Sequence, residues 1–165
     1  MNSFVRILWP LPVTLFGAAC AGVARLFGAR VQLHSGVLEA SGGPLTAVLQ
    51  RMYPPMSVAA ITLGHVVLAQ DAEQLERTRA HERVHVRQYE RWGFLFPLIY
   101  LAASGVALVQ GREGYRGNVF EEEAEAMGAG ASRCELAAEA TERQRHARSL
   151  SNQDLDPEKR VGSVY

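Results

Sequence analysis

The sequence predicts a mostly helical α+β domain that carries an apolar helix at its N-terminus. Its 165 residues, of which 48% are apolar, suffice for one globular domain, and two cysteines are too few for a disulfide-stapled fold. Segment 29–40 has the pattern of a short hairpin and segment 58–68 has the composition of a strand, and helix start and stop signals frame the longer segments after them. We therefore expect an N-terminal segment over residues 1–28, a folded domain over 29–148 and a disordered tail over 149–165.

An uncharged apolar stretch covers residues 7–24, between Arg6 and Arg25. A membrane-spanning helix needs about 20 residues, a length that the stretch reaches only if it runs on to Gly28 with Arg25 in its last turn. Trp9 suits an interfacial anchor. We expect a membrane anchor here, and the alternatives are a cleaved signal peptide and a buried core helix. Because arginines are more numerous after the stretch than before it, the positive-inside rule places the domain in the cytoplasm.

The strand-like segments lie directly after this stretch. Residues 29–40 are expected to form a short hairpin, because two apolar runs flank the turn residues Ser35 and Gly36. The run of Val, Ile and Leu over residues 58–68 predicts one strand. Gly64 within that run indicates a bulge or the close approach of another part of the backbone.

A helix is predicted over residues 72–92. Asp71 is a suitable N-cap, Gln74 completes a capping box three residues on, and Gly93 supplies a stop. These signals are independent of any motif within the helix. They therefore place the side chains of residues 72–92 at regular helical positions.

Two further helices are expected after this one. The apolar run 94–109 is short for a membrane span and contains a proline, so we expect a core, re-entrant or interfacial helix. Asn118 and Glu121 can cap a later helix, which we expect to continue toward residue 148 with breaks near Gly128 and Gly130.

The helix over 72–92 contains the motif HExxH, formed by His81, Glu82 and His85. At 100° per residue the two histidines lie about 40° apart on one face, one turn apart in height, so their imidazoles can converge on one Zn²⁺ ion. Glu82 lies beside them and can act as a general base toward water activated by the metal. The alternative is a solvated, salt-bridged helix surface that binds no metal.

A catalytic zinc site needs a third protein ligand, since a tetrahedral ion then keeps one position open. Four carboxylates occupy the first turns of the later helix, and we prefer Glu121 as the ligand. Glu125 shares its face at i,i+4 spacing and is expected to orient one of the histidines, while Glu122 is the alternative ligand. In the competing interpretation Glu121 is only the third residue of a capping box.

These segments resemble the gluzincin superfamily of zinc metallopeptidases, in which HExxH is followed by a helix of the form E-x-x-A-(D/E). The string HERVHVRQYERWG at residues 81–93 and the N-x-F-E-x-E-A pattern at 118–124 are similar to small bacterial membrane-associated proteins. The chain differs from the larger members in its length and in having Glu125 where they carry Asp. The resemblance implies a minimal zincin-like domain with His81, His85 and Glu121 as zinc ligands and Glu82 as general base.

The resemblance also implies a cleft beside the predicted strand over 58–68, in which gluzincins hold an extended peptide. His65 is then expected to face the substrate, and Tyr115 or Tyr89 is expected to donate to the oxyanion. The substrate would be a peptide or a protein. Nothing in the sequence predicts the oligomeric state.

The sequence therefore predicts a membrane-associated zinc metallopeptidase. Seventeen basic residues balance seventeen acidic ones, which disfavours nucleic-acid binding. One alternative is a membrane-associated binding or regulatory protein with a structural or degenerate zinc site, and another is a two-pass membrane scaffold without metal. A zinc ligand at Glu121 requires that residues 94–109 turn back, because a span there would separate Glu121 from the two histidines.

Overall fold

The computed structural model describes residues 3–52 and 58–153. Contacts within the chain divide it into two units, residues 1–129 and 130–165. The second unit, as far as it is described, is the continuation of the last helix, α6 (Val119–Gln153). All other elements, and the beginning of α6, belong to the first unit. The mixed, mostly helical composition confirms the predicted α+β class.

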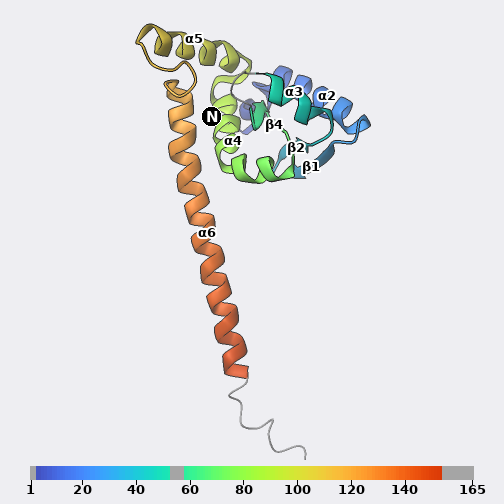
Figure 1. Cartoon of the computed structure of the whole chain (residues 1–165), viewed down its shortest axis with the longest axis vertical. Coiled ribbons are helices and arrows are strands. Elements are labelled where there is room, and N and C mark those ends of the chain that lie inside the picture. Colours follow the sequence, from blue (N-terminus) through green and yellow to red (C-terminus); the bar gives the residue numbers. More distant parts are fainter. Residues whose placement is uncertain (1–2, 53–57, 154–165) are drawn as a thin grey trace, which may run out of the picture. The chain divides into compact units, whose positions relative to one another are not determined.

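A four-stranded sheet lies at the centre of the first unit, in the order β1-β2-β4-β3 (Figure 1). The hairpin of β1 (Arg30–His34) and β2 (Val37–Ser41) is antiparallel, which confirms the hairpin predicted over residues 29–40. The inner strands β2 and β4 (Val66–Ala69) are parallel. On the other side of β4, β3 (Ala60–Leu63) pairs antiparallel and forms an edge of the sheet.

The segment 58–68 contains a tight hairpin, so the prediction of one strand was wrong. Gly64 has a φ of 65°, and Leu63 pairs with Val66 directly across the turn. A Cβ atom at Gly64 would overlap Thr14 of α2 (Leu11–Leu26), so the predicted close approach of backbone at this glycine is confirmed. A single glycine turn inside an otherwise apolar run leaves little sign of the reversal in the sequence.

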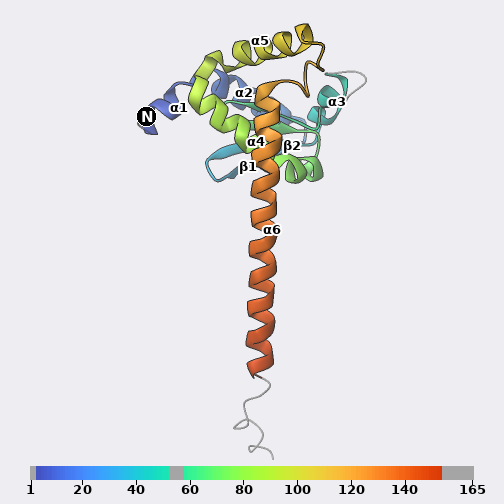
Figure 2. The same cartoon turned by 90° about the vertical axis from the view of Figure 1, so that its left-hand side faces the viewer.

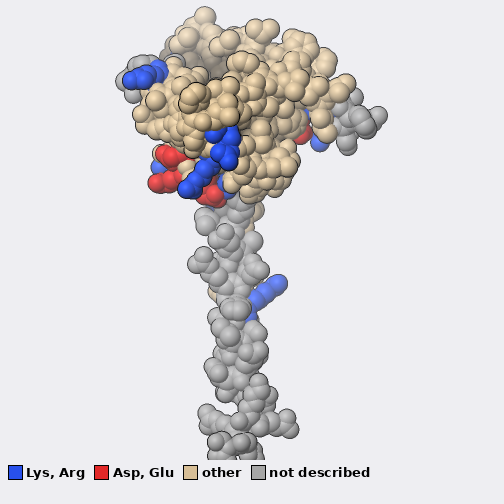
Figure 3. Space-filling model, turned by 90° about the vertical axis from the view of Figure 1, so that its right-hand side faces the viewer, with Lys and Arg blue, Asp and Glu red and all other residues tan. Residues whose placement is uncertain are grey.

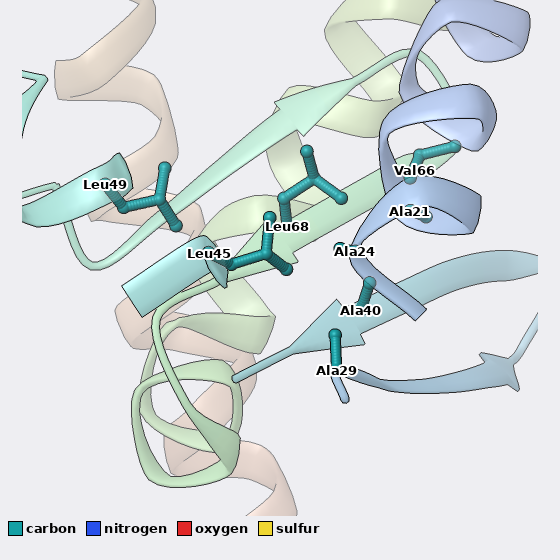
Figure 4. Close-up of a cluster of buried hydrophobic side chains, with 8 residues drawn as sticks. All are labelled: Ala21, Ala24, Ala29, Ala40, Leu45, Leu49, Val66 and Leu68. Atoms are coloured by element: carbon teal, nitrogen blue, oxygen red, sulfur yellow. The ribbon is translucent and has the colours of Figure 1, made fainter. Parts of the chain in front are cut away.

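Helices cover both faces of the sheet. On one face α2 and α3 (Pro44–Arg51) enclose an apolar cluster, drawn in Figure 4. On the other face α4 (Ala72–Trp92) packs against a second cluster that includes Val67 and Val86. Successive residues of β4 point to opposite faces, so this strand is buried on both sides.

The predicted N-terminal anchor consists of two helices, α1 (Ser3–Leu8) and α2, that meet at Trp9 and Pro10. The small residues Gly17, Ala21 and Ala24 face the sheet. A Cβ at Gly17 would lie 2.9 Å from the Cβ atoms of Leu63 and Val66. The helix therefore packs on the domain along one side only. It is neither a free anchor nor a wholly buried core helix.

The helix predicted over 72–92 is confirmed as α4. Asp71 Oδ1 accepts a hydrogen bond of 2.8 Å from the backbone N–H of Gln74, and Gly93 ends the helix with a φ of 64°. A short 3-10 turn, η1 (Gly93–Leu95), then leads into α5 (Phe96–Val109). By length and composition alone the stretch 72–109 could cross a membrane, and α2 is a shorter apolar helix, which together give weak support for membrane association.

The chain reverses after α5 and begins α6 close to α4 (Figure 2). The side-chain amide of Asn118 donates to Tyr100 O at 3.0 Å and to Ser104 Oγ at 2.8 Å, and Asn118 Oδ1 accepts from the backbone N–H of Phe120 at 2.9 Å. One buried asparagine therefore both caps α6 and holds it to α5.

The breaks predicted at Gly128 and Gly130 do not occur, since α6 is helical from Val119 to Gln153. Ala, Glu and Met flank the two glycines, and these strong helix formers outweigh a cost of about 1 kcal/mol per glycine. A Cβ at Gly128 would lie 3.0 Å from the Cα of His81, so this glycine allows α6 to approach α4 closely. The helix also includes 149–153, where the sequence predicted a disordered tail. The rest of that tail lies outside the described residues.

A buried ion pair ties α4 to the sheet. Glu39 of β2, only 1% exposed, accepts hydrogen bonds from Arg79 Nε at 3.1 Å and from Gln32 Nε2 at 2.8 Å. A nitrogen of Arg83 lies 3.6 Å from the same carboxylate. Burial alone would raise the pKa of Glu39, but the hydrogen bonds from Arg79 and Gln32 outweigh it and hold the pKa below its usual range.

We expect Glu39→Gln to lower the free energy of unfolding at neutral pH by about 2–3 kcal/mol, because it leaves Arg79 without its buried partner. The folded pKa of Glu39 is below the unfolded one, so its contribution is complete above the ordinary carboxyl pKa of about 4 and is lost as the pH falls through the folded value. The difference from wild type should therefore shrink in acid. Urea titrations at several pH values measure it.

Glu76→Gln is the matched control, since Glu76 pairs with the same arginine from an exposed position. We expect it to change the free energy of unfolding by less than about 1 kcal/mol. Equal effects of the two substitutions would contradict the role assigned to Glu39.

Candidate metal centre

Two histidines of α4 and one glutamate of α6 converge on one point. The Nε2 atoms of His81 and His85 lie 3.1 Å apart. Each is 3.3 Å from an oxygen of Glu121, His81 from Oε2 and His85 from Oε1. Among the residues that the structure describes, these three form the group whose ligand atoms could hold a metal ion. The two histidines of HExxH and Glu121 in the first turn of α6 thus come together as the sequence predicted.

The distances in this group suit a bound metal ion. Three ligands at about 2.0–2.1 Å from a tetrahedral ion stand about 3.3–3.4 Å from one another. The separations of 3.1, 3.3 and 3.3 Å in the group are close to that edge length. In addition, Glu121 Oε2 is the one buried side-chain N or O atom in the described part of the chain that lacks a hydrogen-bond partner. A cation between the three side chains would supply that partner, so the residues fit a divalent metal ion.

Glu121 is held ionised in a buried position. Its side chain is 3% exposed, and the Tyr100 hydroxyl donates to Oε1 at 2.7 Å. Burial would raise the pKa of Glu121, but its close contacts with His81 and His85 and the hydrogen bond from Tyr100 outweigh burial and hold the pKa far below its usual range. The same carboxylate raises the pKa of His85 against the effect of burial, and burial with Glu121 raises the pKa of Tyr100.

Gln88 orients the second histidine. Its Oε1 lies 2.8 Å from His85 Nδ1, and its Nε2 donates to Phe120 O at 3.0 Å and to Glu123 Oε2 at 2.9 Å. Because the amide oxygen can only accept, Nδ1 carries the proton and the Nε2 lone pair is directed into the site. The sequence predicted this orienting role for Glu125, whereas Gln88, one turn beyond His85 on the same helix, occupies the position.

Glu82 is buried beside the group without belonging to it. It is 5% exposed, and Thr62 of β3 donates to its Oε2 at 2.6 Å. Burial raises the pKa of Glu82, although His85, Thr62 and His81 act in the opposite direction. A solvated helix surface, the alternative interpretation of the motif, does not describe this carboxylate, which is enclosed between α4 and the edge strand.

The group opens into a cavity of about 660 Å³. Its walls come from β3, α4 and α5, and most of the lining side chains are apolar, among them Ile61, Leu63, Phe96 and Leu101. The backbone of β3 runs along the cavity as a free sheet edge. The arrangement therefore offers a metal-binding group and a buried carboxylate at one side of an apolar cleft.

Of the other predicted site residues, Tyr115 and Tyr89 line this cavity and His65 does not. Tyr115 lines it, and both burial and Glu121 raise the pKa of the Tyr115 hydroxyl. Tyr89 also lines it, and burial raises the pKa of Tyr89 to about 12. His65 lies in the β3–β4 turn, 3.5 Å from Glu90, and is not part of the lining.

Glu122 and Glu125 do not join the metal-binding group. Both are exposed, and Glu122 pairs with Arg112 after α5. Three residues that were not predicted from the sequence as part of the site contact it: Thr62, Gln88 and Tyr100. Gln88 could have been found from its helical spacing to His85. Thr62 and Tyr100 contact residues about 20 positions away, and no local sequence pattern predicts such contacts.

No protein-family model matches the chain, and comparisons with curated proteins and with solved structures find no match. The likeness to gluzincins thus stays a prediction from the motifs.

We expect the chain to bind one divalent metal ion, and we expect His81→Ala, His85→Ala and Glu121→Ala each to lose it or bind it far more weakly, because each removes one ligand of three. Equilibrium dialysis against Zn²⁺ followed by metal analysis of the protein measures the stoichiometry. Glu122→Ala and Glu125→Ala are the matched controls on the same helix and should keep the ion. Loss of the ion in Glu122→Ala, with retention in Glu121→Ala, would contradict the assignment.

Proposed function

We propose that the chain is a zinc-dependent metallopeptidase that hydrolyses peptide bonds at a membrane. The observation that carries this proposal is the group of His81, His85 and Glu121 with Glu82 buried beside it. Two histidines and a glutamate are the donor set of many catalytic zinc sites, whereas structural zinc sites use four protein ligands. The motif resemblance to gluzincins supports the same conclusion.

The residues divide the proposed reaction between them. Zinc, when bound, supplies a Lewis acid that makes water more acidic and polarises a carbonyl group. Glu82 accepts the proton of the attacking water and later delivers it to the leaving amine. Thr62 holds one oxygen of Glu82 through its 2.6 Å hydrogen bond, which fixes the orientation of the carboxylate toward the metal-binding group. The hydroxyl of Tyr115, in the cavity wall, is proposed to donate to the oxyanion.

The free edge of β3 is proposed to hold the substrate. An extended peptide can add to an exposed sheet edge through main-chain hydrogen bonds, and it would then lie along the cavity beside α4. Apolar side chains of the cavity would receive apolar substrate side chains. The substrate is thus a peptide or an extended protein segment.

The N-terminal segment is proposed to keep the domain at the membrane. Large apolar side chains on the outer side of α2 support this, and Arg25 and Arg30 after them favour the cytoplasmic side. Zinc-dependent hydrolysis and attachment to the membrane are independent parts of the proposal, and an experiment can refute either one without refuting the other.

We expect Glu82→Gln to bind zinc as wild type does and to lose about 10²- to 10⁴-fold in hydrolysis rate, because an amide cannot accept the proton. A quenched fluorescent peptide library and metal analysis on the same preparation measure both quantities. Glu90→Gln, on the same helix and outside the cavity lining, is the control and should keep full activity. A zinc-loaded Glu82→Gln protein with full activity would show that the mechanism is wrong.

We expect Thr62→Val to lower the hydrolysis rate by about tenfold at unchanged zinc content, because it removes one hydrogen bond to the general base. Thr62→Ser keeps the hydroxyl and should restore most of the rate. If the two variants lose activity equally, Thr62 contributes packing rather than orientation of Glu82.

A further inference from the structure

The outer side of α2 is an unpartnered apolar surface. While its small residues face the sheet, the opposite side presents Leu15, Phe16, Val23, Leu26 and the following Phe27. Each of these five is at least 56% exposed, and Leu26 reaches 83%. Isolated exposed apolar residues are common, but five on one side of one helix are a contiguous patch of the kind that marks an interaction surface.

The outer side of α5 has the same character. Of its fourteen residues only Phe96 and Ala107 are buried, whereas Leu98, Leu101 and Val109 are between 65% and 90% exposed. The side that faces the domain instead carries Tyr100 and Ser104, with their hydrogen bonds to Glu121 and Asn118. The helix is therefore held by one side only.

The two helices begin beside each other. The rings of Trp9 and Phe94 are 5.4 Å apart, and the backbone N–H of Phe94 donates to Trp9 O at 3.2 Å. Both aromatic residues are 40–46% exposed, so they continue the apolar surface from the start of α2 to the start of α5. Figure 3 shows a broad face of the protein on which uncharged side chains dominate, while charged side chains lie toward its lower edge and at its upper left and right margins.

The sequence segments that form this surface carry charges of one sign. Residues 1–30 and 91–112 contain no Asp or Glu. Arg25 at the end of α2 and Arg30 at the start of β1 are exposed, and no ion pair is found for either in the described part of the chain. Cations next to an apolar helix side are complementary to a surface of acyl chains beneath anionic headgroups.

Neither helix alone is long enough to cross a bilayer, and Gly93, with a φ of 64°, divides the stretch 72–109 between α4 and α5. At 1.5 Å per residue, α2 and α5 are about 24 and 21 Å long, against a hydrocarbon core of about 30 Å. In addition, Glu121 meets His81 and His85, so α5 cannot separate them by crossing the membrane. A helix of this length can bury its apolar side away from water when it lies in the plane of the membrane interface.

We propose that the outer sides of α2 and α5, joined at Trp9 and Phe94, dock in the plane of one leaflet of a membrane that contains anionic lipids. The docking face thus replaces a spanning anchor. It does not depend on the metal or on hydrolysis. Leu101 of this face also lines the cavity into which the metal-binding group opens.

The test is flotation of the zinc-loaded full chain with lipid vesicles. We expect the protein to float with vesicles of phosphatidylcholine and phosphatidylglycerol, and less with phosphatidylcholine alone. Leu26→Glu combined with Leu98→Glu, one residue on each helix, should lower the bound fraction at least about tenfold. Leu33→Glu is the matched control, because Leu33 is 74% exposed and belongs to β1 rather than to α2 or α5, and it should bind as wild type does.

Zinc content of each variant verifies that the domain is folded, so loss of flotation at full zinc content supports the proposal. Wild type that binds zinc and floats with neither vesicle would overturn it, as would a double variant that floats like wild type. Wild type that self-associates without vesicles, and is made monomeric by the double substitution without ever floating, would assign the face to a second copy of the chain instead.

A labelling experiment separates docking from spanning. Gln110→Cys and Glu73→Cys are made with Cys20 and Cys134 replaced by Ser, and vesicle-bound protein is treated with a membrane-impermeant maleimide from outside. In-plane docking leaves both positions reactive, since Glu121 after α5 contacts His81 and His85 and both ends of α5 then lie on the same side of the membrane as α4. Protection of Gln110→Cys alone would show that α5 crosses the bilayer and would overturn the proposal.

Discussion

The close crossing of α4 by the beginning of α6 is the constraint on which the first unit depends. The metal-binding group exists only because Glu121 returns to the histidines of α4 after a detour of some 35 residues. Two features make the return possible: Gly128, which lets the helix backbones approach, and Asn118, which caps α6 while it bonds to α5. The position of α5 follows from the same contacts, since its Tyr100 bonds to the ligand itself.

The helix α4 serves the fold and the site with different sides. Its arginines reach the buried Glu39 and the β1–β2 turn, where Arg83 donates to the backbone oxygens of His34 and Ser35. Its histidines face the opposite way, toward α6. Between the two sides, Glu82 bonds to the edge strand through Thr62. Because one rigid helix carries all these contacts, the spacing of His81, His85 and Glu82 is set by helix geometry rather than by loops.

The sequence predicted those features that local signals determine. The helix over 72–92 has its cap and its stop within a few residues, and the histidine pair follows from helical periodicity. The features that were missed depend on partners far along the chain. Gly64 reverses a strand and Gly128 admits a neighbouring helix, yet each reads locally as a bulge or a break. Thr62 and Tyr100 become site residues only when strand β3 and helix α5 are folded onto α4 and α6.

The same return of Glu121 also constrains how the apolar helices can meet a membrane. Apolar side chains on α5 favour transfer into a hydrocarbon environment, and a helix of sufficient length would gain most by crossing it. Crossing would move Glu121 away from His81 and His85 and leave a buried carboxylate without its partners, which is costly. With α5 also too short to span, burial of its outer side and retention of the metal-binding group are compatible only when the helix lies along the surface, where both conditions hold at once.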